Sequence, residues 1–129
     1  MEAAAVSNKI RVLIADDHRL FAETLEALLA TEDRVEVVGS ARDGKDAVRL
    51  ARKLRPDVIL MDISMPVMDG FEATRRIRQE GQDACVLMLT GSNSRTDVDR
   101  ARKAGAAAYV TKDRIAAELI DAIVEVVSR

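Results

Sequence analysis

Five short apolar runs, spaced along 129 residues, are the feature that most constrains how this chain folds. Each run is rich in β-branched residues and too short to be a helix. Several are apolar at consecutive positions, which is typical of central parallel strands covered on both faces. The predicted strands are IRVLIA at 10–15, VEVVGSA at 35–41, DVILMD at 57–62, ACVLMLT at 84–90 and AAYVT at 107–111.

Longer stretches with helical periodicity separate the five runs. Three of them carry an apolar face with helical spacing. These faces are formed by Leu20, Phe21, Leu25, Leu28 and Leu29, by Ala47, Val48, Ala51 and Leu54, and by Ile115, Leu119, Ile120, Ile123, Val124 and Val127. The other two stretches, 70–80 and 94–104, are more polar, and we expect them to be more exposed.

Glycine and proline residues at the boundaries of these segments support an alternating order of strands and helices. Gly44 precedes the second helix and Pro56 follows it, while Gly105 falls where the fourth helix must end, a usual place for a left-handed residue. Right-handed crossovers between parallel strands place helices on both faces of the sheet. The sequence therefore predicts an α/β fold, a doubly wound five-stranded parallel sheet with five helices.

Length and composition limit what the chain does. We expect one domain at 10–127, between a flexible N-terminal extension at 1–9 and a short C-terminal end at 128–129. The 20 basic and 22 acidic residues are spread along the chain, which predicts no direct nucleic acid binding. No signal peptide or bilayer-spanning stretch is evident, so a cytoplasmic location without membrane contact is expected. Cys85 is expected to be buried and inert.

Polar side chains stand where the predicted strands end. Asp16 and Asp17 end the first strand, Asp62 the third and Thr90 the fourth, and Lys112 follows the fifth. Ligands of doubly wound sheets bind at the carboxyl ends of the strands, so these groups should converge on one edge. Three close carboxylates repel one another unless a cation lies between them. Such a site suits Mg²⁺, and zinc is disfavoured because the chain has no cluster of histidines or cysteines.

A cation beside Asp62 would allow this carboxylate to react with a phosphoryl group. An aspartate carboxylate can attack a phosphoryl group to form an aspartyl phosphate. The charge of the transferred group is stabilised by metal, ammonium and hydroxyl groups. Mg²⁺, Lys112 and Thr90 would supply these three kinds of group.

Four motifs carry a family resemblance: DDH at 16–18, DVILMDISMPVMDG at 57–70, LMLTG at 87–91 and AGAAAYVTKD at 104–113. Together they resemble the receiver (REC) domain of bacterial two-component response regulators of the NarL/LuxR-like class. The resemblance implies a flavodoxin-like (βα)5 sandwich with strand order 2-1-3-4-5. It also implies phosphorelay signal transduction by a domain that is no enzyme beyond catalysing its own phosphorylation and dephosphorylation.

The resemblance assigns roles to individual residues. Asp62 is the implied phosphoacceptor, Lys112 contacts the phosphoryl group, and Thr90 and Tyr109 form the switch pair. The implied ligands of Mg²⁺, or of Mn²⁺ in its place, are Asp16 (largely through bound water), Asp17, Asp62 and the main-chain carbonyl of Ser64.

The resemblance also implies partners. These are a sensor histidine kinase or a small phosphodonor, and a second copy of the chain in a homodimer formed on phosphorylation. The chain is either a stand-alone receiver or a domain of a larger regulator. In the second case, transcription regulation would follow through a DNA-binding output domain absent from this chain. Ser64 and Ser92 flank the path of hydrolytic water in the family, and because both are small and neutral they leave the lifetime of the phosphorylated form open. The geometry of the peptide between Lys112 and Asp113, where many receivers have proline, is also open.

Other interpretations remain at this point. Asp17 could cap the first helix, Tyr109 could simply pack in the core, and His18 is expected to be an ordinary helix-start residue. Rival functions are a metal-dependent phosphatase, a flavin-binding electron carrier and an interaction module that is never phosphorylated. Many such phosphatases need a second carboxylate where this chain has Ser64, and an aromatic content of only 2% disfavours a flavin site.

Overall fold

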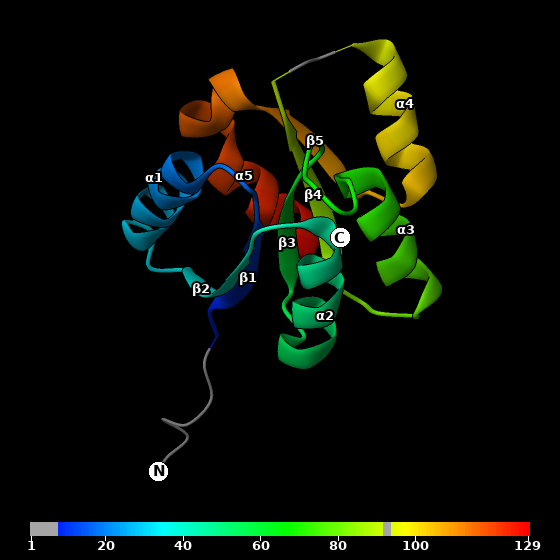
Figure 1. The fold of residues 1–129 in the computed structure, drawn as a ribbon. Coiled ribbons are helices and arrows are strands. Elements are labelled where there is room, and N and C mark those ends of the chain that lie inside the picture. The colour runs from blue at the N-terminus through cyan, green and yellow to red at the C-terminus, as the bar shows by residue number, and fades with distance from the viewer. Residues whose placement is uncertain (1–7, 92–93) are drawn as a thin grey trace.

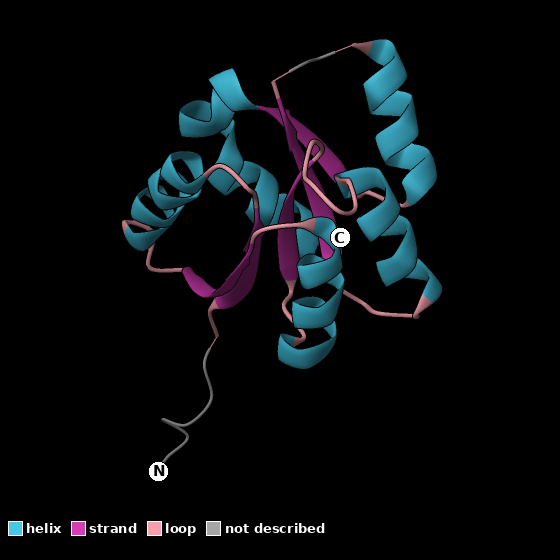
Figure 2. Ribbon diagram, in the orientation of Figure 1, coloured by secondary structure: helices cyan, strands magenta, loops and turns pink. Residues whose placement is uncertain are grey.

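The computed structural model describes residues 8–91 and 94–129 and confirms the predicted α/β architecture (Figures 1 and 2). Five parallel strands form one sheet in the order β2-β1-β3-β4-β5. The strands are β1 (Ile10–Ala15), β2 (Val35–Ala41), β3 (Val58–Asp62), β4 (Cys85–Thr90) and β5 (Ala108–Thr111). The helices are α1 (Arg19–Ala30), α2 (Gly44–Leu54), α3 (Gly70–Gln79), α4 (Arg95–Ala104) and α5 (Ile115–Val127), with a short 3-10 helix, η2 (Lys112–Arg114), before α5. Across the described ranges, every helix is too short or too polar to cross a membrane.

The sheet separates two apolar cores, one on each face, and helices lie on both of its faces (Figure 2). Along β3, Ile59 and Met61 belong to one core, and Val58 and Leu60 belong to the other. Helices α2, α3 and α4 cover the first core, and α1 and α5 cover the second (Figure 1). Because β3 is buried on both faces, its sequence is apolar up to Asp62 instead of alternating with polar residues.

The helix ends follow local sequence signals. Asp43, Asp69 and Ser94 each accept a hydrogen bond from the main-chain N–H three residues further on, and so cap the starts of α2, α3 and α4. Gly105 ends α4 with a φ of 107°, the left-handed conformation that its position predicts. These caps set where each helix starts relative to the strand before it.

Three helix faces differ from the predicted ones. In α5 the difference is limited to Val127, which was predicted for the apolar face and is 36% exposed. Leu20 is 79% exposed, because it lies two residues before buried Ala22, roughly 200° around the helix from the face that packs on the sheet. Helix α3 buries Phe71 and Ile77 despite its polar composition, because its apolar residues gather on the inner face. Helix α4 is more exposed, as predicted.

Candidate functional site

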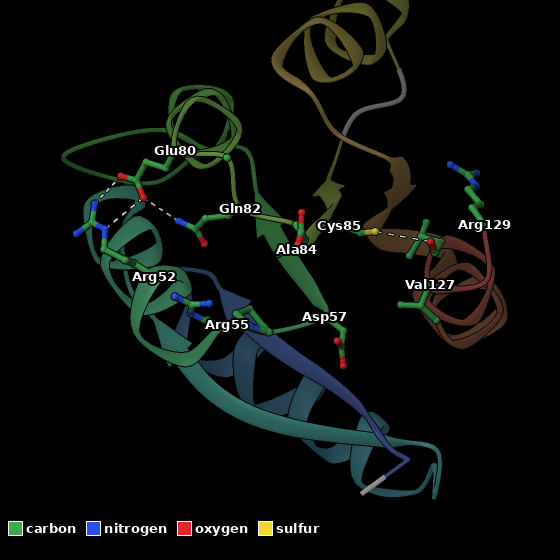
Figure 3. A pocket seen from close by; sticks show the side chains of 13 residues that line it. Arg52, Arg55, Asp57, Glu80, Gln82, Ala84, Cys85, Val127 and Arg129 are labelled. Atoms are coloured by element: carbon green, nitrogen blue, oxygen red, sulfur yellow. Dashed lines mark hydrogen bonds and ion pairs between the residues drawn. The ribbon is translucent and has the colours of Figure 1, made fainter. Parts of the chain in front are cut away.

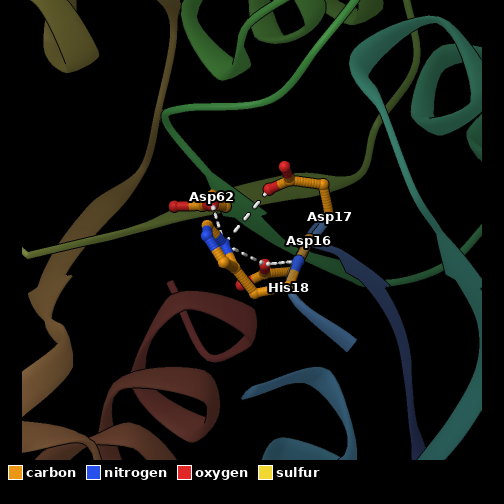
Figure 4. Close-up of side chains that lie close together, drawn as sticks. All are labelled: Asp16, Asp17, His18 and Asp62. Atoms are coloured by element: carbon orange, nitrogen blue, oxygen red, sulfur yellow. Dashed lines mark hydrogen bonds and ion pairs between the residues drawn. The ribbon is translucent and has the colours of Figure 1, made fainter. Parts of the chain in front are cut away.

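The carboxyl ends of the strands bring the predicted acidic residues together. Strands β1 and β3 are neighbours in which Ala15 pairs with Met61, so Asp16 and Asp62 stand side by side at the ends of these strands. Their exposed fractions are only 3% and 4%. Asp17 is more exposed and contributes a third carboxylate from the loop before α1 (Figure 4). The predicted acidic trio is therefore one cluster.

His18 faces these carboxylates, which its position in the sequence did not indicate. Its Nδ1 lies 3.2 Å from Asp17 Oδ1, 3.4 Å from Asp16 Oδ1 and 3.9 Å from Asp62 Oδ2 (Figure 4). Asp16 Oδ1 also accepts a 2.7 Å hydrogen bond from the His18 main-chain N–H. His18 occupies the N-cap position of α1 without a side-chain capping bond. Asp17 therefore does not cap α1, because His18 occupies the cap position.

Lys112 reaches the cluster from η2. Its Nζ lies 3.4 Å from Asp62 Oδ1 and 3.6 Å from Asp16 Oδ2. The same ammonium stacks 4.3 Å from the centroid of the Phe21 ring on α1, a contact that holds it beside the acids. The described residues contain no cis peptide bond, so the bond between Lys112 and Asp113 is trans.

The electrostatics of the cluster favour a bound cation. Burial raises the pKa of the Asp62 carboxyl above its ordinary value, the charge of Asp16 raises it further, and Lys112 opposes both effects. Oδ2 of Asp16 and Oδ2 of Asp62 are buried and have no hydrogen-bond partner among the described residues. Buried carboxylate oxygens that accept no hydrogen bond cost free energy. A hard divalent cation in contact with them would remove that cost, so the residues present fit such an ion.

An open pocket of about 640 Å³ leads to the cluster. Ser64, the predicted main-chain ligand, lines it together with Asp17 and His18. Arg100 of α4 lines it too, with its guanidinium carbon 4.1 Å from the centroid of the Phe71 ring. Sequence reasoning missed Arg100 because a charged residue in a polar helix carries no signal of what it faces. Ser92 lies outside the described residues.

Thr90 and Tyr109, the predicted switch pair, are in contact. They lie on the neighbouring strands β4 and β5, and their side chains share a hydrogen bond. Thr90 is buried, and Tyr109 is half-buried against the core beneath α2, α3 and α4. Burial raises the pKa of the Tyr109 phenol, and the hydrogen bond with Thr90 partly offsets this rise. Tyr109 therefore both packs against the core and shares a hydrogen bond with Thr90, so the two interpretations of this residue are compatible.

The loop after β3 is held by close main-chain contacts. Gly70 donates a 2.7 Å hydrogen bond to the carbonyl of the residue after Asp62, and Gly44 donates one of 3.0 Å to Met68. Within this loop, Val67 has a φ of 70°, in a turn closed by a 2.7 Å hydrogen bond from the Met68 N–H to the Pro66 carbonyl. This is a strained γ-turn conformation for a β-branched residue. The loop that carries Ser64 is thus closed by the bond of Gly70 and tied to the start of α2 by the bond of Gly44.

A larger hollow, of about 850 Å³, lies at the opposite end of the sheet (Figure 3). It is lined by residues at the starts of β3 and β4 and at the end of α5. Arg52 pairs there with Glu80. Cys85 is half-buried instead of fully buried as predicted, because it begins β4 at this open end, with its Sγ 3.6 Å from the Val126 carbonyl. None of the predicted site residues lines this hollow.

Comparisons with known proteins agree with this arrangement. Residues 12–124 match the response regulator receiver domain family. The chain is 45% identical over 116 residues to the transcriptional regulatory protein DegU of Brevibacillus brevis, covering 90% of this chain and 49% of DegU. It is 46% identical over 114 residues to the transcriptional regulatory protein LiaR of Bacillus subtilis, covering 88% and 54%. The chain therefore spans about half the length of these relatives.

Solved structures match the chain over nearly its whole length. The signal receiver domain of NarL from Mycobacterium tuberculosis has a TM-score of 0.91 at 34% identity, covering 95% of this chain and 98% of that one. A chain of the CheX-CheY-BeF3-Mg complex from Borrelia burgdorferi has a TM-score of 0.84 at 25% identity, covering 91% and 88%. Fold, family match and strand-end residues agree, and the chain belongs to the response regulator receiver domain family.

Proposed function

We propose that the chain is a phosphorylation switch whose acceptor is Asp62. The observation that carries this proposal is the meeting of Lys112 with Asp16 and Asp62, at a point where two buried carboxylate oxygens have no hydrogen-bond partner in the described part of the chain. A purely structural cluster would gain by satisfying these oxygens within the protein. A site that binds a cation beside the phosphoryl group keeps these oxygens available.

In the proposed reaction, an oxygen of the Asp62 carboxylate bonds to the phosphorus of the donor. The phosphorus–nitrogen bond of a phosphohistidine, or the phosphorus–oxygen bond of acetyl phosphate, breaks and leaves its electron pair with the donor. Lys112, already 3.4 Å from Asp62 Oδ1, would then hold the negative charge of the transferred group.

The cation proposed for this site is Mg²⁺, with Mn²⁺ as a substitute. Its ligands would be Asp16 through water, Asp17, Asp62 and the main-chain carbonyl of Ser64. When bound, the cation neutralises charge on the phosphoryl oxygens. The related complex from Borrelia burgdorferi contains Mg²⁺ together with BeF3, which supports this choice.

The proposed donor is a sensor histidine kinase, with small phosphodonors as substitutes in vitro. The chain would have no other substrate, because it would catalyse only its own phosphorylation and dephosphorylation. DegU and LiaR are transcriptional regulatory proteins about twice as long as the matched region. That length supports control of transcription through a DNA-binding output domain. A homodimer formed on phosphorylation is part of the same proposal.

Phosphorylation would reach the surface through Thr90 and Tyr109. The Thr90 hydroxyl, which shares a hydrogen bond with Tyr109, would turn toward the new dianionic group. The Tyr109 ring would then lose that bond and move. A phosphoryl group can only shift states that it stabilises unequally, so the unmodified protein would already sample the switched form.

Intact mass spectrometry after incubation with acetyl phosphate tests the proposed function. In Mg²⁺ the wild type is expected to gain one phosphoryl group, and Asp62→Asn is expected to gain none, because the variant lacks the nucleophilic carboxylate. Removing the cation with EDTA should also abolish the gain. Asp69→Asn is the matched control, since this carboxylate caps α3 and lines the same pocket but lies outside the acidic cluster, and the variant should be phosphorylated normally. Wild-type phosphorylation of Asp62→Asn would refute the assignment.

Thr90→Ala is expected to accept the phosphoryl group but to transmit it poorly to Tyr109. Tyr109 is the one tyrosine of a chain without tryptophan, so its fluorescence reports the switch directly. The phosphorylation-dependent change in that fluorescence should be largely lost in Thr90→Ala and kept in Thr90→Ser, which retains the hydroxyl. A full response in Thr90→Ala would rule out this pair as the switch.

A further inference from the structure

The imidazole of His18 adds a nitrogen donor to the acidic cluster. One ligand atom from each of Asp16, Asp17, His18 and Asp62 lies within 4.8 Å of the other three. We infer that His18 Nδ1 is a ligand at this cation site and makes it bind zinc-class cations more tightly than Mg²⁺. This inference rests on the proposed function, because it concerns the same site.

The distances match those between neighbouring ligands of one metal ion. Zn²⁺ binds imidazole nitrogen and carboxylate oxygen at about 2.0–2.2 Å, so adjacent ligands of a tetrahedral or octahedral ion lie about 3.0–3.5 Å apart. His18 Nδ1 is 3.2 Å from Asp17 Oδ1 and 3.4 Å from Asp16 Oδ1. The Asp62 oxygen is further away, at 3.9 Å. The imidazole is 65% exposed and has room to close that gap.

A second, independent observation points to a ligand at the same place. The Asp62 oxygen that faces His18 is one of the two buried carboxylate oxygens that have no hydrogen-bond partner within residues 8–91 and 94–129. The other belongs to Asp16, whose second oxygen faces His18. An ion between these groups would contact the unsatisfied oxygen of Asp62 and the histidine nitrogen together.

The donor set of three carboxylates and one imidazole has a selectivity that an all-carboxylate site lacks. Mg²⁺ prefers oxygen ligands and keeps its waters, so it gains little from His18. Zn²⁺ and Co²⁺ bind imidazole well and rank above Mn²⁺ in affinity for mixed nitrogen and oxygen sites. Zinc, disfavoured by the lack of a histidine cluster in the sequence, is therefore supported by a single well-placed histidine.

Calorimetric titration of the tag-free chain with Mg²⁺ and, separately, with Zn²⁺ tests this inference. His18→Gln is expected to lower the Zn²⁺ affinity about tenfold or more while changing the Mg²⁺ affinity less than about twofold. Cys85→Ser is the matched control for the other zinc-binding side chain, at the far end of the sheet, and should bind Zn²⁺ as the wild type does. Asp62→Asn should weaken both cations.

Spectroscopy supplies a readout that a merely structural role of His18 would not change. His18 is the chain's only histidine, so its ring nitrogen resonances need no assignment and should shift with Zn²⁺ but not with Mg²⁺. Co²⁺ should give a visible absorption spectrum that changes in His18→Gln. Unchanged Zn²⁺ affinity in His18→Gln, or an equal loss for both cations, would overturn the inference. A wild type that binds no Mg²⁺ would instead count against the proposed function.

Discussion

Gly70→Ala is expected to lose about 2 kcal/mol or more of its free energy of unfolding, a fall in Tm of roughly 6–10 °C. A Cβ at this position would overlap the main-chain oxygen of Asp62 and would lie 3.0 Å from the Ile63 Cα. The obstacle is backbone, so no side chain can turn aside to make room. Either the end of β3 or the start of α3 has to move.

The same movement should impair phosphorylation. Gly70 also donates its main-chain N–H to the Ile63 carbonyl at 2.7 Å, directly beside the acceptor. Relieving the overlap would shift the Asp62 carboxylate relative to Lys112. Displacements of this kind reduce reaction rates steeply, and we expect a loss of roughly tenfold or more in the rate with acetyl phosphate.

Thermal unfolding followed by circular dichroism, and the rate of mass gain, measure the two effects of Gly70→Ala. Gly91→Ala is the matched control, because a Cβ at that position meets no atom within 4 Å among the described residues other than its chain neighbours, and its φ is outside the left-handed range. The control should keep the stability of the wild type. Normal stability together with a normal rate in Gly70→Ala would show that the loop does not hold the acceptor.

The strands could be predicted closely because buried parallel strands leave a strong apolar signal. Strands β1 and β2 have the predicted bounds, and β3, β4 and β5 begin one residue later than predicted and end where predicted. The strand order came from the family resemblance, since alternating strands and helices are compatible with more than one order. The structure confirms that order.

The strand-end residues could be predicted for a similar reason, and the groups around them could not. Parallel strands bring Asp16, Asp62 and Lys112 to one edge whatever the loops do. The position of His18 depends on the turn into α1, where its N–H bonds to Asp16 Oδ1. The contact of Gly70 with Asp62 depends on how the loop folds back over β3. Both contacts depend on the tertiary structure. The sequence therefore identified His18 only as a helix-start residue and Gly70 only as a turn residue.

Asp62→Asn is expected to be more stable than the wild type in EDTA at neutral pH, by about 1–2 kcal/mol. The change removes a buried carboxylate whose Oδ2 has no hydrogen-bond partner. Burial and Asp16 raise the Asp62 pKa in the folded protein. Between the ordinary and the raised pKa, the folded state therefore binds more protons than the unfolded state, and wild-type stability falls as pH rises. The advantage of the variant should be small below about pH 4 and should grow toward neutral pH.

Mg²⁺ should remove that advantage, because it stabilises only a folded protein that binds it. Cation at about 100 times its Kd would add roughly 2.7 kcal/mol to the wild type, and less to Asp62→Asn, which lacks one ligand. Tm measured from pH 4 to pH 8, in EDTA and in Mg²⁺, checks both parts, with Asp69→Asn as the control for loss of a carboxylate outside the cluster. If Asp62→Asn were less stable than the wild type in EDTA at every pH, the attraction of Lys112 would outweigh burial and the repulsion of Asp16. The carboxylate would then be a structural ion pair, and its cost would not be the reason that the fold binds a cation.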